Sequence, residues 1–379
     1  MKIKAAKLVL PDREVELASL EIADGLIQSI GVAGGDADFD LSDSVVFPGF
    51  IDVHNHGSVG IDVLEATQDG LAEVSQYLAS QGVSGWLPTT VPASDENYAQ
   101  VASIVELAMR DENNGAARVL GIHYEGPFVN SLQCGALHTS HFKTYKDPAD
   151  LDNLKAPPTG AKMTTLAPEI AGGLELIAEL KRRGWVVSIG HTRADLKTLD
   201  AAFENGARHM THFMNAMTPL HHRTPGPVNW GLLRDDVTCD IIADGIHLDP
   251  SMLNLIVKVK KAQSLALISD AIAATGKGDG DYEIWGEKIS VKDGRTSNVG
   301  GSIAGSVISM LDAVKMMRSL GTSDVEIAQM ASSNPARLLG IDAECGSIEE
   351  GKRADLVAID RDGRVVLTLI GGQIAFSSQ

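Results

Sequence analysis

The segment from Pro48 to Gly60, PGFIDVHNHGSVG, contains a short and largely apolar run, Phe50–Val53, that is followed by two histidines, His54 and His56. A run of this length after Pro-Gly predicts a buried β-strand. Two imidazoles at the end of such a strand have two explanations. They are ordinary polar residues of a loop, or the strand end holds a metal ion, and the rest of the chain has to distinguish the two.

Apolar and β-branched runs of strand length recur through the middle of the chain and alternate with amphipathic stretches. The stretches at residues 70–82, 173–184 and 196–207 have apolar residues at helical spacing, with glycine at or near the end, as is typical of helix C-termini. Alternating strands and helices predict parallel βα units, and eight such units predict an α/β fold of the (β/α)8 TIM-barrel type. The eight expected strands are Phe50–Val53, Val83–Leu87, Arg118–Tyr124, Lys162–Leu166, Val186–Ile189, Arg208–Thr211, Thr238–Ile242 and Leu265–Ser269.

The two ends of the chain follow a different pattern from the middle. Both alternate apolar and polar residues in short runs that Pro, Asp and Gly interrupt, which is typical of strands joined by turns. Neither end is long enough to build a good core by itself. We therefore expect residues 1–47 and 343–379 to form one small β-sandwich domain, with a catalytic barrel of residues 48–342 inserted between them.

Composition limits the class of protein. The chain has 379 residues, 44% of them hydrophobic, and a formal net charge of −18. This charge argues against nucleic acid as a partner, because phosphate contacts need clustered Lys and Arg, but it permits an anionic small molecule in a local basic pocket. The three cysteines, Cys134, Cys239 and Cys345, are far apart and form no CxxC pair, so neither a disulfide framework nor a zinc knuckle is expected.

The sequence also predicts a protein without a membrane partner. The first 25 residues lack the apolar core of a signal peptide, and no apolar stretch approaches the roughly 20 residues of a membrane span. We therefore expect a cytoplasmic location.

Ionisable residues follow six of the eight predicted strands, at the barrel end where catalytic groups lie. Each has a structural explanation when taken alone, since a strand-end histidine is usually hydrogen-bonded and an aspartate often caps a helix. Buried together without a partner they would be costly, and four of the imidazoles with two of the carboxylates predict a site for one or two divalent metal ions. The residues at these strand ends are His54, His56, Glu125, His191, His212, Asp244, His247 and Asp270.

The chain resembles the amidohydrolase superfamily and, within it, the N-acetylglucosamine-6-phosphate deacetylase family. The resemblance covers nearly the whole chain and rests on the segments PGFIDVHNHG, GIHYEGPFVN, SIGHT, THFMNAM, ADGIHLD, SDAIAATG and GSIEEGKRADLVAID. It implies a metal-dependent hydrolase that removes the N-acetyl group of an amino-sugar 6-phosphate, with N-acetylglucosamine 6-phosphate as the first expected substrate and acetate as a product.

The resemblance also implies the roles of the strand-end residues. Asp270 would act as general base toward water and then as acid toward the amine, and His247 would steady the carbonyl oxygen. Glu125 would bridge two ions, because both histidines of the HNH segment are present. We expect zinc first, with iron, cobalt or manganese as alternatives. The metal ligands it implies are His54, His56, Glu125, His191, His212 and Asp270.

Substrate recognition is also inferred from the resemblance. Arg223 matches an arginine that binds sugar phosphate and often comes from the neighbouring subunit, so we expect a homodimer. The chain departs from the family at Gly135–His138, where GALH is one residue longer than the usual Gly-x-His, so that His138 or His141 would touch the substrate. The residues implied in substrate binding are Gly135, His138, Asn215, Ala216, Arg223, His247 and Ile303.

This departure leaves other substrates open. The galacto epimer, N-acetylgalactosamine 6-phosphate, and other N-acyl amines, such as N-acyl-D-amino acids or cyclic amides, are alternatives for the same chemistry. A barrel that binds or assembles without catalysis is a third interpretation, and the complete set of ligands argues against it.

Overall fold

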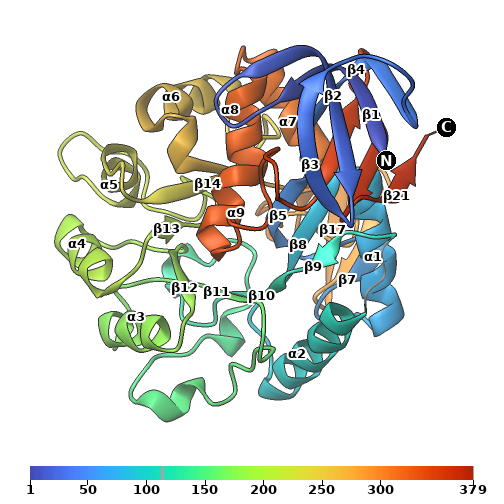
Figure 1. Cartoon of the computed structure of the whole chain (residues 1–379). Helices are drawn as coiled ribbons and strands as arrows, with labels where there is room; N and C mark the ends of the chain where they lie inside the picture. The colour runs from blue at the N-terminus through green and yellow to red at the C-terminus, as the bar shows by residue number, and fades with distance from the viewer. Residues whose placement is uncertain (112–114, 379) are drawn as a thin grey trace.

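The computed structural model describes residues 1–111 and 115–378. Within these residues eight parallel strands form a barrel that helices surround, as the sequence predicts (Figure 1). Every predicted strand is confirmed, most of them with ends shifted by only a few residues. In barrel order the strands are β5 (Phe50–Asn55), β8 (Val83–Thr90), β10 (Gly121–Glu125), β11 (Ala161–Leu166), β12 (Val186–Ile189), β13 (His209–Met210), β14 (Thr238–Ile242) and β15 (Leu265–Ile268).

The barrel closes at the residues that the sequence analysis singled out. The segment after β15 runs beside the end of β5, where the Asp270 N–H donates to the His54 carbonyl at 3.0 Å. The His56 N–H donates to the Ala271 carbonyl at 2.7 Å. Closure of the barrel therefore brings Asp270 beside His54 and His56, although more than 200 residues separate Asp270 from the two histidines in sequence.

Helices with apolar inner faces cover the barrel, and α1, α2 and α4 begin with a side-chain cap. Thr67, Ser94 and Asp195 each accept a backbone N–H of the first turn. Among residues 1–111 and 115–378, none of the helices combines the length and hydropathy of a membrane-spanning segment. The helices are α1 (Gln68–Ser80), α2 (Asp95–Arg110), α3 (Gly173–Arg182), α4 (Leu196–Asn205), α5 (Pro227–Leu233), α6 (Pro250–Lys260), α7 (Met310–Ser319), α8 (Asp324–Ala328) and α9 (Asn334–Leu339).

Both ends of the chain join in one sheet, which confirms the expected small β unit. The sheet curls around its own apolar core, so that β3 meets the loop before β19, where the Ile27 N–H donates to the Lys352 carbonyl at 2.9 Å. Both termini lie beside this sheet in Figure 1. In sheet order its strands are β21 (Gln373–Ser377), β20 (Val365–Ile370), β19 (Leu356–Ile359), β4 (Phe39–Pro48), β1 (Lys2–Val9), β2 (Glu14–Ala23) and β3 (Leu26–Val32).

An antiparallel insertion that the sequence analysis did not predict follows β15. It consists of β16 (Gly280–Ile284), β17 (Glu287–Lys292) and β18 (Arg295–Ser297). Trp285 and Gly286 form the two-residue turn between β16 and β17, and both have positive φ, 55° and 74°. The remaining elements are β6 (Gly57–Ser58), β7 (Ile61–Asp62), β9 (Arg118–Val119), 3₁₀ turns at Ser131–Gln133, Thr139–His141, Pro148–Leu151 and Ala262–Ser264, and a π-helical turn at Gln329–Ser333.

Candidate metal centre

Four imidazoles surround the carboxylate of Glu125 at the C-terminal end of the barrel. The Nε2 atoms of His191 and His212 each lie 2.9 Å from Glu125 Oε1. On the other side, His56 Nε2 lies 3.3 Å and His54 Nε2 lies 3.8 Å from Glu125 Oε2. The two oxygens of one carboxylate therefore face two pairs of histidines, and each pair with Glu125 forms a group of ligand atoms close enough to hold a cation.

The backbone at three of the site residues is unusual. His191, His212 and Asp270 follow β12, β13 and β15 with φ of 47°, 30° and 51°, in the left-handed region that residues other than glycine rarely occupy. Such conformations are concentrated at functional sites. Glu169 helps to hold one of these turns, because its carboxylate accepts the Thr192 hydroxyl at 2.6 Å. The local strain therefore marks the same strand ends as the side-chain chemistry.

Backbone carbonyls fix the orientation of one histidine from each pair. His191 Nδ1 lies 2.8 Å from the Gln133 carbonyl oxygen, and His56 Nδ1 lies 3.2 Å from that of Thr89. A carbonyl oxygen accepts a hydrogen bond only, so these Nδ1 atoms are donors. With Nδ1 as the donor, Nε2 is the nitrogen that can bind a cation, and a carbonyl at Nδ1 is the usual outer contact of a histidine that binds a metal.

Asp270 lies beside the first histidine pair and is ionised. Its Oδ1 is 3.3 Å from the Nε2 atoms of both His54 and His56, and it is buried with no hydrogen-bond partner in the described part of the chain. Burial alone would raise the pKa of Asp270, but the neighbouring His54 and His56 lower it overall. An unpaired, charged oxygen at this position can accept a proton or contact a cation.

The charges of the site fit a divalent cation. Burial would raise the pKa of Glu125, yet hydrogen bonds from the surrounding histidines hold it well below its usual range. Burial would lower the pKa of His56 and His212, yet the carboxylates raise it to about 10 and about 9. The buried carboxylates therefore require positive charge. A divalent ion supplies it in place of protons, and imidazole nitrogens with carboxylate oxygens are suitable ligands for zinc and other transition metals.

A cavity of about 290 Å³ adjoins the metal ligands, and several predicted substrate residues line it. Asn215 contributes a buried amide nitrogen that has no hydrogen-bond partner in the described residues. His247 Nδ1 lies 2.6 Å from Asp244 Oδ2. Burial would raise the pKa of Asp244, but this hydrogen bond and the charge of His247 lower it overall. The predicted residues that the structure brings to this cavity are Gly135, Asn215, Ala216, His247, Ile303 and Asp270.

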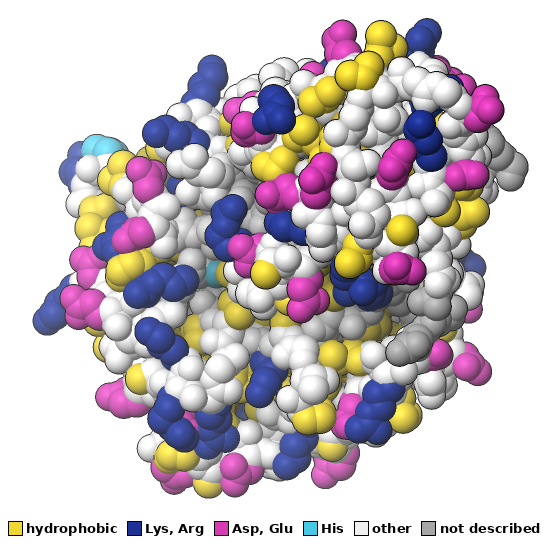
Figure 2. Space-filling model, viewed as in Figure 1, with side chains coloured by type: hydrophobic (Ala, Val, Ile, Leu, Met, Phe, Trp, Pro, Cys, Tyr) yellow, Lys and Arg dark blue, Asp and Glu magenta, His cyan; other side chains and the backbone are white. Residues whose placement is uncertain are grey.

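The other two predicted substrate residues do not line this cavity. His138 is exposed, with Nε2 3.8 Å from Glu287, and His141 is also exposed. Arg223 is exposed in the segment before α5. Figure 2 shows a histidine side chain at the edge of the molecule beside α5, on a face where acidic and basic side chains are interspersed. Within one chain, these residues are therefore separate from the cavity beside the candidate metal centre.

Trp285 is an aromatic residue of the cavity that the sequence analysis missed. It lies in the turn of the inserted sheet, lines the cavity, and packs edge-on against His56 with 5.4 Å between ring centroids. Its φ of 55° puts a bulky residue in the left-handed region. The only sign of this in the sequence is the pair Trp-Gly between two strand-like runs, and nothing in that pattern predicts that the turn folds back onto the metal ligands.

Comparison with known proteins agrees with this geometry. The sequence profile of the amidohydrolase family matches residues 45–375. The N-acetylglucosamine-6-phosphate deacetylase of Bacillus subtilis (strain 168) is 39% identical over 346 residues, covering 89% of this chain and 86% of that relative. The N-acetylgalactosamine-6-phosphate deacetylase of Escherichia coli O157:H7 is 36% identical over 379 residues, covering 98% of each.

The same likeness is found among solved structures. The N-acetyl-D-glucosamine-6-phosphate deacetylase of Mycobacterium smegmatis, solved as a mutant in complex with N-acetyl-D-glucosamine-6-phosphate, superposes with a TM-score of 0.92 at 31% identity. The superposition covers 100% of this chain and 99% of the other. The chain therefore belongs to the amidohydrolase family and, within it, to the N-acetylglucosamine-6-phosphate deacetylase family.

Proposed function

We propose that the protein is a metal-dependent deacetylase that hydrolyses N-acetylglucosamine 6-phosphate to glucosamine 6-phosphate and acetate. The observation that carries this proposal is the arrangement around Glu125, whose two oxygens each face two histidines, with the ionised Asp270 3.3 Å from one pair. The relatives that act on amino-sugar phosphates supply the substrate class. In this proposal His54, His56, Glu125, His191, His212 and Asp270 hold one or two divalent ions, zinc first.

The reaction breaks the amide C–N bond and forms a C–O bond from water. When bound, a divalent metal lowers the pKa of water and polarises the amide carbonyl. Asp270 takes the proton of the attacking water on Oδ1 and gives it to the departing nitrogen, which leaves as the amine. His247 steadies the carbonyl oxygen with a hydrogen bond from Nε2, and Asp244 orients the ring through Nδ1.

The cavity supplies the remaining contacts to the sugar. Asn215 can donate from its unpartnered amide nitrogen to a sugar oxygen, and Ile303 and Trp285 provide apolar walls that exclude water. We place Arg223 in the pocket of a second subunit, where its planar guanidinium would bind the 6-phosphate in a homodimer. Its exposed position outside the cavity of its own chain supports this arrangement.

N-Acetylgalactosamine 6-phosphate is the second candidate substrate. The Escherichia coli relative that acts on it matches 98% of this chain. The segment Gly135–His138, which is one residue longer than the usual Gly-x-His, also leaves room for a different sugar. An N-acyl-D-amino acid is a weaker candidate, because it has no phosphate for Arg223. We also propose a cytoplasmic location and a division into a β domain, residues 1–47 and 343–379, and a catalytic barrel, residues 48–342.

Acetate release tests the proposal directly. Purified, zinc-loaded protein is given N-acetylglucosamine 6-phosphate, its galacto epimer or unphosphorylated N-acetylglucosamine at equal concentrations. We expect turnover of the first substrate, with kcat/KM at least tenfold above that of the unphosphorylated sugar. Arg223→Met is then expected to raise KM for the phosphorylated substrate only. Equal turnover with and without the phosphate contradicts the substrate class, and no acetate from any of the three contradicts the proposed reaction.

A further inference from the structure

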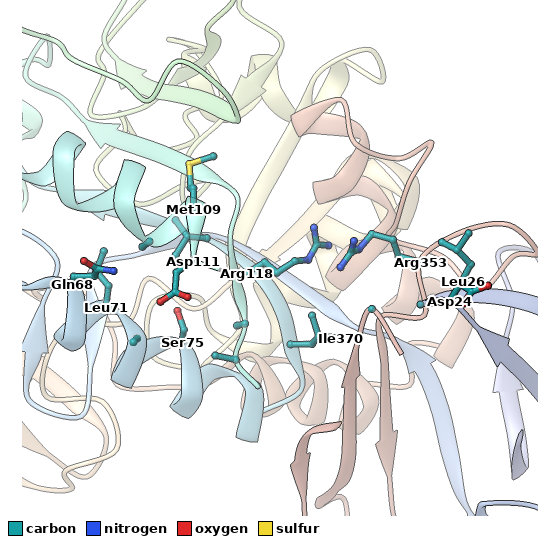
Figure 3. A pocket seen from close by; sticks show the side chains of 17 residues that line it. Asp24, Leu26, Gln68, Leu71, Ser75, Met109, Asp111, Arg118, Arg353 and Ile370 are labelled. Atoms are coloured by element: carbon teal, nitrogen blue, oxygen red, sulfur yellow. The ribbon is translucent and has the colours of Figure 1, made fainter. Parts of the chain in front are cut away.

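Another cavity, of about 470 Å³, lies between the curled sheet and helices α1 and α2, far from the residues proposed for catalysis (Figure 3). It reaches Arg118 and Val119 of β9, which precede β10 in the chain. Glu125 stands at the opposite, C-terminal end of β10. The cavity is therefore at the N-terminal side of the barrel strands, and none of the residues that line it belongs to the metal centre.

Two arginines converge in this cavity on one carboxylate. Arg118 Nη2 lies 2.6 Å from Asp355 Oδ2, and Arg353 Nε lies 3.6 Å from the same oxygen, which is beyond hydrogen-bond distance. Figure 3 shows the two guanidinium groups pointing toward one another. Asp355 is buried and also accepts the Gly371 N–H at 2.7 Å. Two cations facing one such carboxylate leave an excess of one positive charge at this end of the cavity, although the exposed carboxylates of Asp24 and Asp111 also line it.

This positive charge is only partly exposed to solvent. The side chains of Arg118 and Arg353 are 28% and 34% exposed, and the Nε atoms of both are buried with no hydrogen-bond partner in the described residues. Gly371 leaves room for one guanidinium, because a Cβ there would lie 2.9 Å from Arg353 Nη2. Partly buried guanidinium donors without partners are favourable contacts for a bound anion, and their planar geometry suits phosphate.

The rest of the lining suits a polyhydroxylated ring. The Ser75 hydroxyl accepts the Trp86 indole N–H at 2.9 Å, so its own hydrogen is free to donate. Gln68 and Asp111 add an amide and a carboxylate, and Leu71 contributes an apolar wall. Asp24 and Asp111 are both exposed, so solvent screens their repulsion of an anion at the arginine pair. An anionic group at one end, hydroxyl partners at the other and an apolar wall match a sugar phosphate.

We propose that this cavity is a second ligand site, which binds a sugar phosphate with the phosphate at Arg118 and Arg353 and the hydroxyl or amino groups at Gln68, Ser75 and Asp111. A ligand bound there connects the sheet, through Arg353, to the barrel, through Arg118, and so stabilises their packing. The site rests on the proposed function only for the choice of probe, glucosamine 6-phosphate, which is the proposed product. The geometry of the cavity does not depend on catalysis.

Hydrogen exchange measured by mass spectrometry separates the two sites. We expect glucosamine 6-phosphate to slow amide exchange in residues 24–27, 68–75 and 351–355, and unphosphorylated glucosamine at the same concentration to leave these segments unchanged. Protection at residues 135–137 and 215–216 reports separately on the catalytic cavity. If glucosamine 6-phosphate protects only the catalytic segments, or if glucosamine protects the second site equally well, the proposal is wrong.

Two variants and a control identify the groups involved. Arg353→Met removes one guanidinium while Asp355 keeps Arg118 and the Gly371 N–H, and it is expected to weaken binding at this site about 10- to 100-fold, the usual effect of losing hydrogen bonds to a charged group. Ala72→Met fills the cavity from α1 with both charges retained and should abolish the protection. Arg182→Met, at an exposed arginine of α3, should change nothing. Unchanged protection in both cavity variants overturns the proposal, whatever the acetate assay shows.

Discussion

Two neighbouring regions of the barrel interior contain the same kinds of buried side chain but differ in how their polar atoms are paired. One region, here called the lower region, lies along the strands before their C-terminal ends. In it, His123 Nε2 lies 2.9 Å from the Thr165 hydroxyl and His209 Nε2 lies 2.9 Å from Asp240 Oδ2. At the strand ends, Asp270 Oδ1 and the Nδ1 atoms of His54 and His212 are equally buried and have no partner in the described residues.

This difference distinguishes structure from function more reliably than residue type does. In the lower region the buried polar atoms form hydrogen bonds with other side chains of the protein. Burial holds the pKa of His123 well below its usual range, so that its ring is neutral. At the strand ends the Nε2 atoms of the histidines face the oxygens of Glu125 and Asp270, close enough for a cation to bind between them. Loss of a side chain from the lower region should therefore reduce stability, and loss of one from the strand ends should reduce activity.

Loss of the metal should have the largest effect. Because Glu125 is shared by both ligand groups, Glu125→Gln is expected to lower bound zinc, measured by elemental analysis, and to reduce acetate release to the background of the assay. Chelation of the wild-type protein should do the same, with activity restored by added zinc. Glu106→Gln on α2 is the matched control and should keep full metal content. Full turnover in protein stripped of metal contradicts the assignment of this region.

Asp270→Asn should have the next largest effect. Removal of a positioned acid–base group is expected to lower kcat by about 10²–10⁴-fold. Asn fills the same space beside His54 and His56, so the free energy of unfolding, measured in denaturant, should change less than in a variant that leaves a buried hydrogen bond unmade. Bound metal should stay near the wild-type level. Turnover within a few-fold of wild type would show that Asp270 is not the acid–base group.

Asp240→Asn is the matching substitution in the lower region and should have the opposite result. Asp240 is fully buried and accepts from His209 Nε2 at 2.9 Å and from the His212 N–H. Disruption of these buried hydrogen bonds is expected to reduce the free energy of unfolding by about 1–3 kcal/mol. A stability loss as small as that of Asp270→Asn would remove the distinction between the two regions.

Asp62 is intermediate between Asp240, which has hydrogen-bond partners, and Asp270. It lies outside the groups that could hold a cation, and one of its oxygens is buried without a partner in the described residues. Burial raises its pKa to about 6, whereas the unfolded chain titrates near 3.8. Between about pH 4 and 6 the folded protein therefore binds more protons than the unfolded chain. The contribution of Asp62 to the free energy of unfolding falls as pH rises through that window. Asp62→Asn should remove this slope and stabilise the protein at pH 7 by no more than about 2 kcal/mol, because the side chain is partly exposed.

Denaturant unfolding of the metal-free wild-type and Asp62→Asn proteins at pH 4 and pH 7 measures this effect. The quantity compared is the change in the free energy of unfolding between the two pH values, in wild type and in the variant. Metal-free protein is needed because a nearby cation would lower the pKa of the carboxylate. Ser80→Ala, on α1, serves as a control that should leave the pH dependence unchanged. A difference between wild type and variant that does not vary with pH would mean that Asp62 is already charged throughout.

The sequence could predict which ionisable residues gather at the strand ends, but not which buried groups have hydrogen-bond partners. Apolar runs fix the strands, and a parallel barrel gathers their C-terminal ends, so His54 and Asp270 could be placed together from strand order alone. Asp240 also lies in an apolar run, and only the packing of β13 against β14 shows that His209 pairs with it. Arg118 and Arg353 come from distant parts of the chain, so no local pattern predicts that they converge.

Substitution of Trp285 should have the smallest effect at the strand ends. This residue lines the cavity beside His56, a proposed metal ligand. That position is next to the reacting carbonyl in the proposed mechanism, so the indole should limit the size of the acyl group. Trp285→Gly is expected to raise the kcat/KM ratio of N-propionyl to N-acetyl substrate by up to about tenfold, the discrimination typical of one methylene. Glycine adopts a φ of 55° without strain, which offsets part of the stability lost with the packing of the indole.

Competition between the two acyl substrates, followed by release of propionate and acetate, measures this ratio in a single reaction. Trp285→Phe keeps an aromatic wall and should stay close to wild type. A ratio that is unchanged in Trp285→Gly would mean that the indole does not face the acyl group. Zinc content and acetate turnover near the wild-type values in the same variant would then show that the metal ligands alone define the reacting end of the cavity, and that the inserted sheet only covers them.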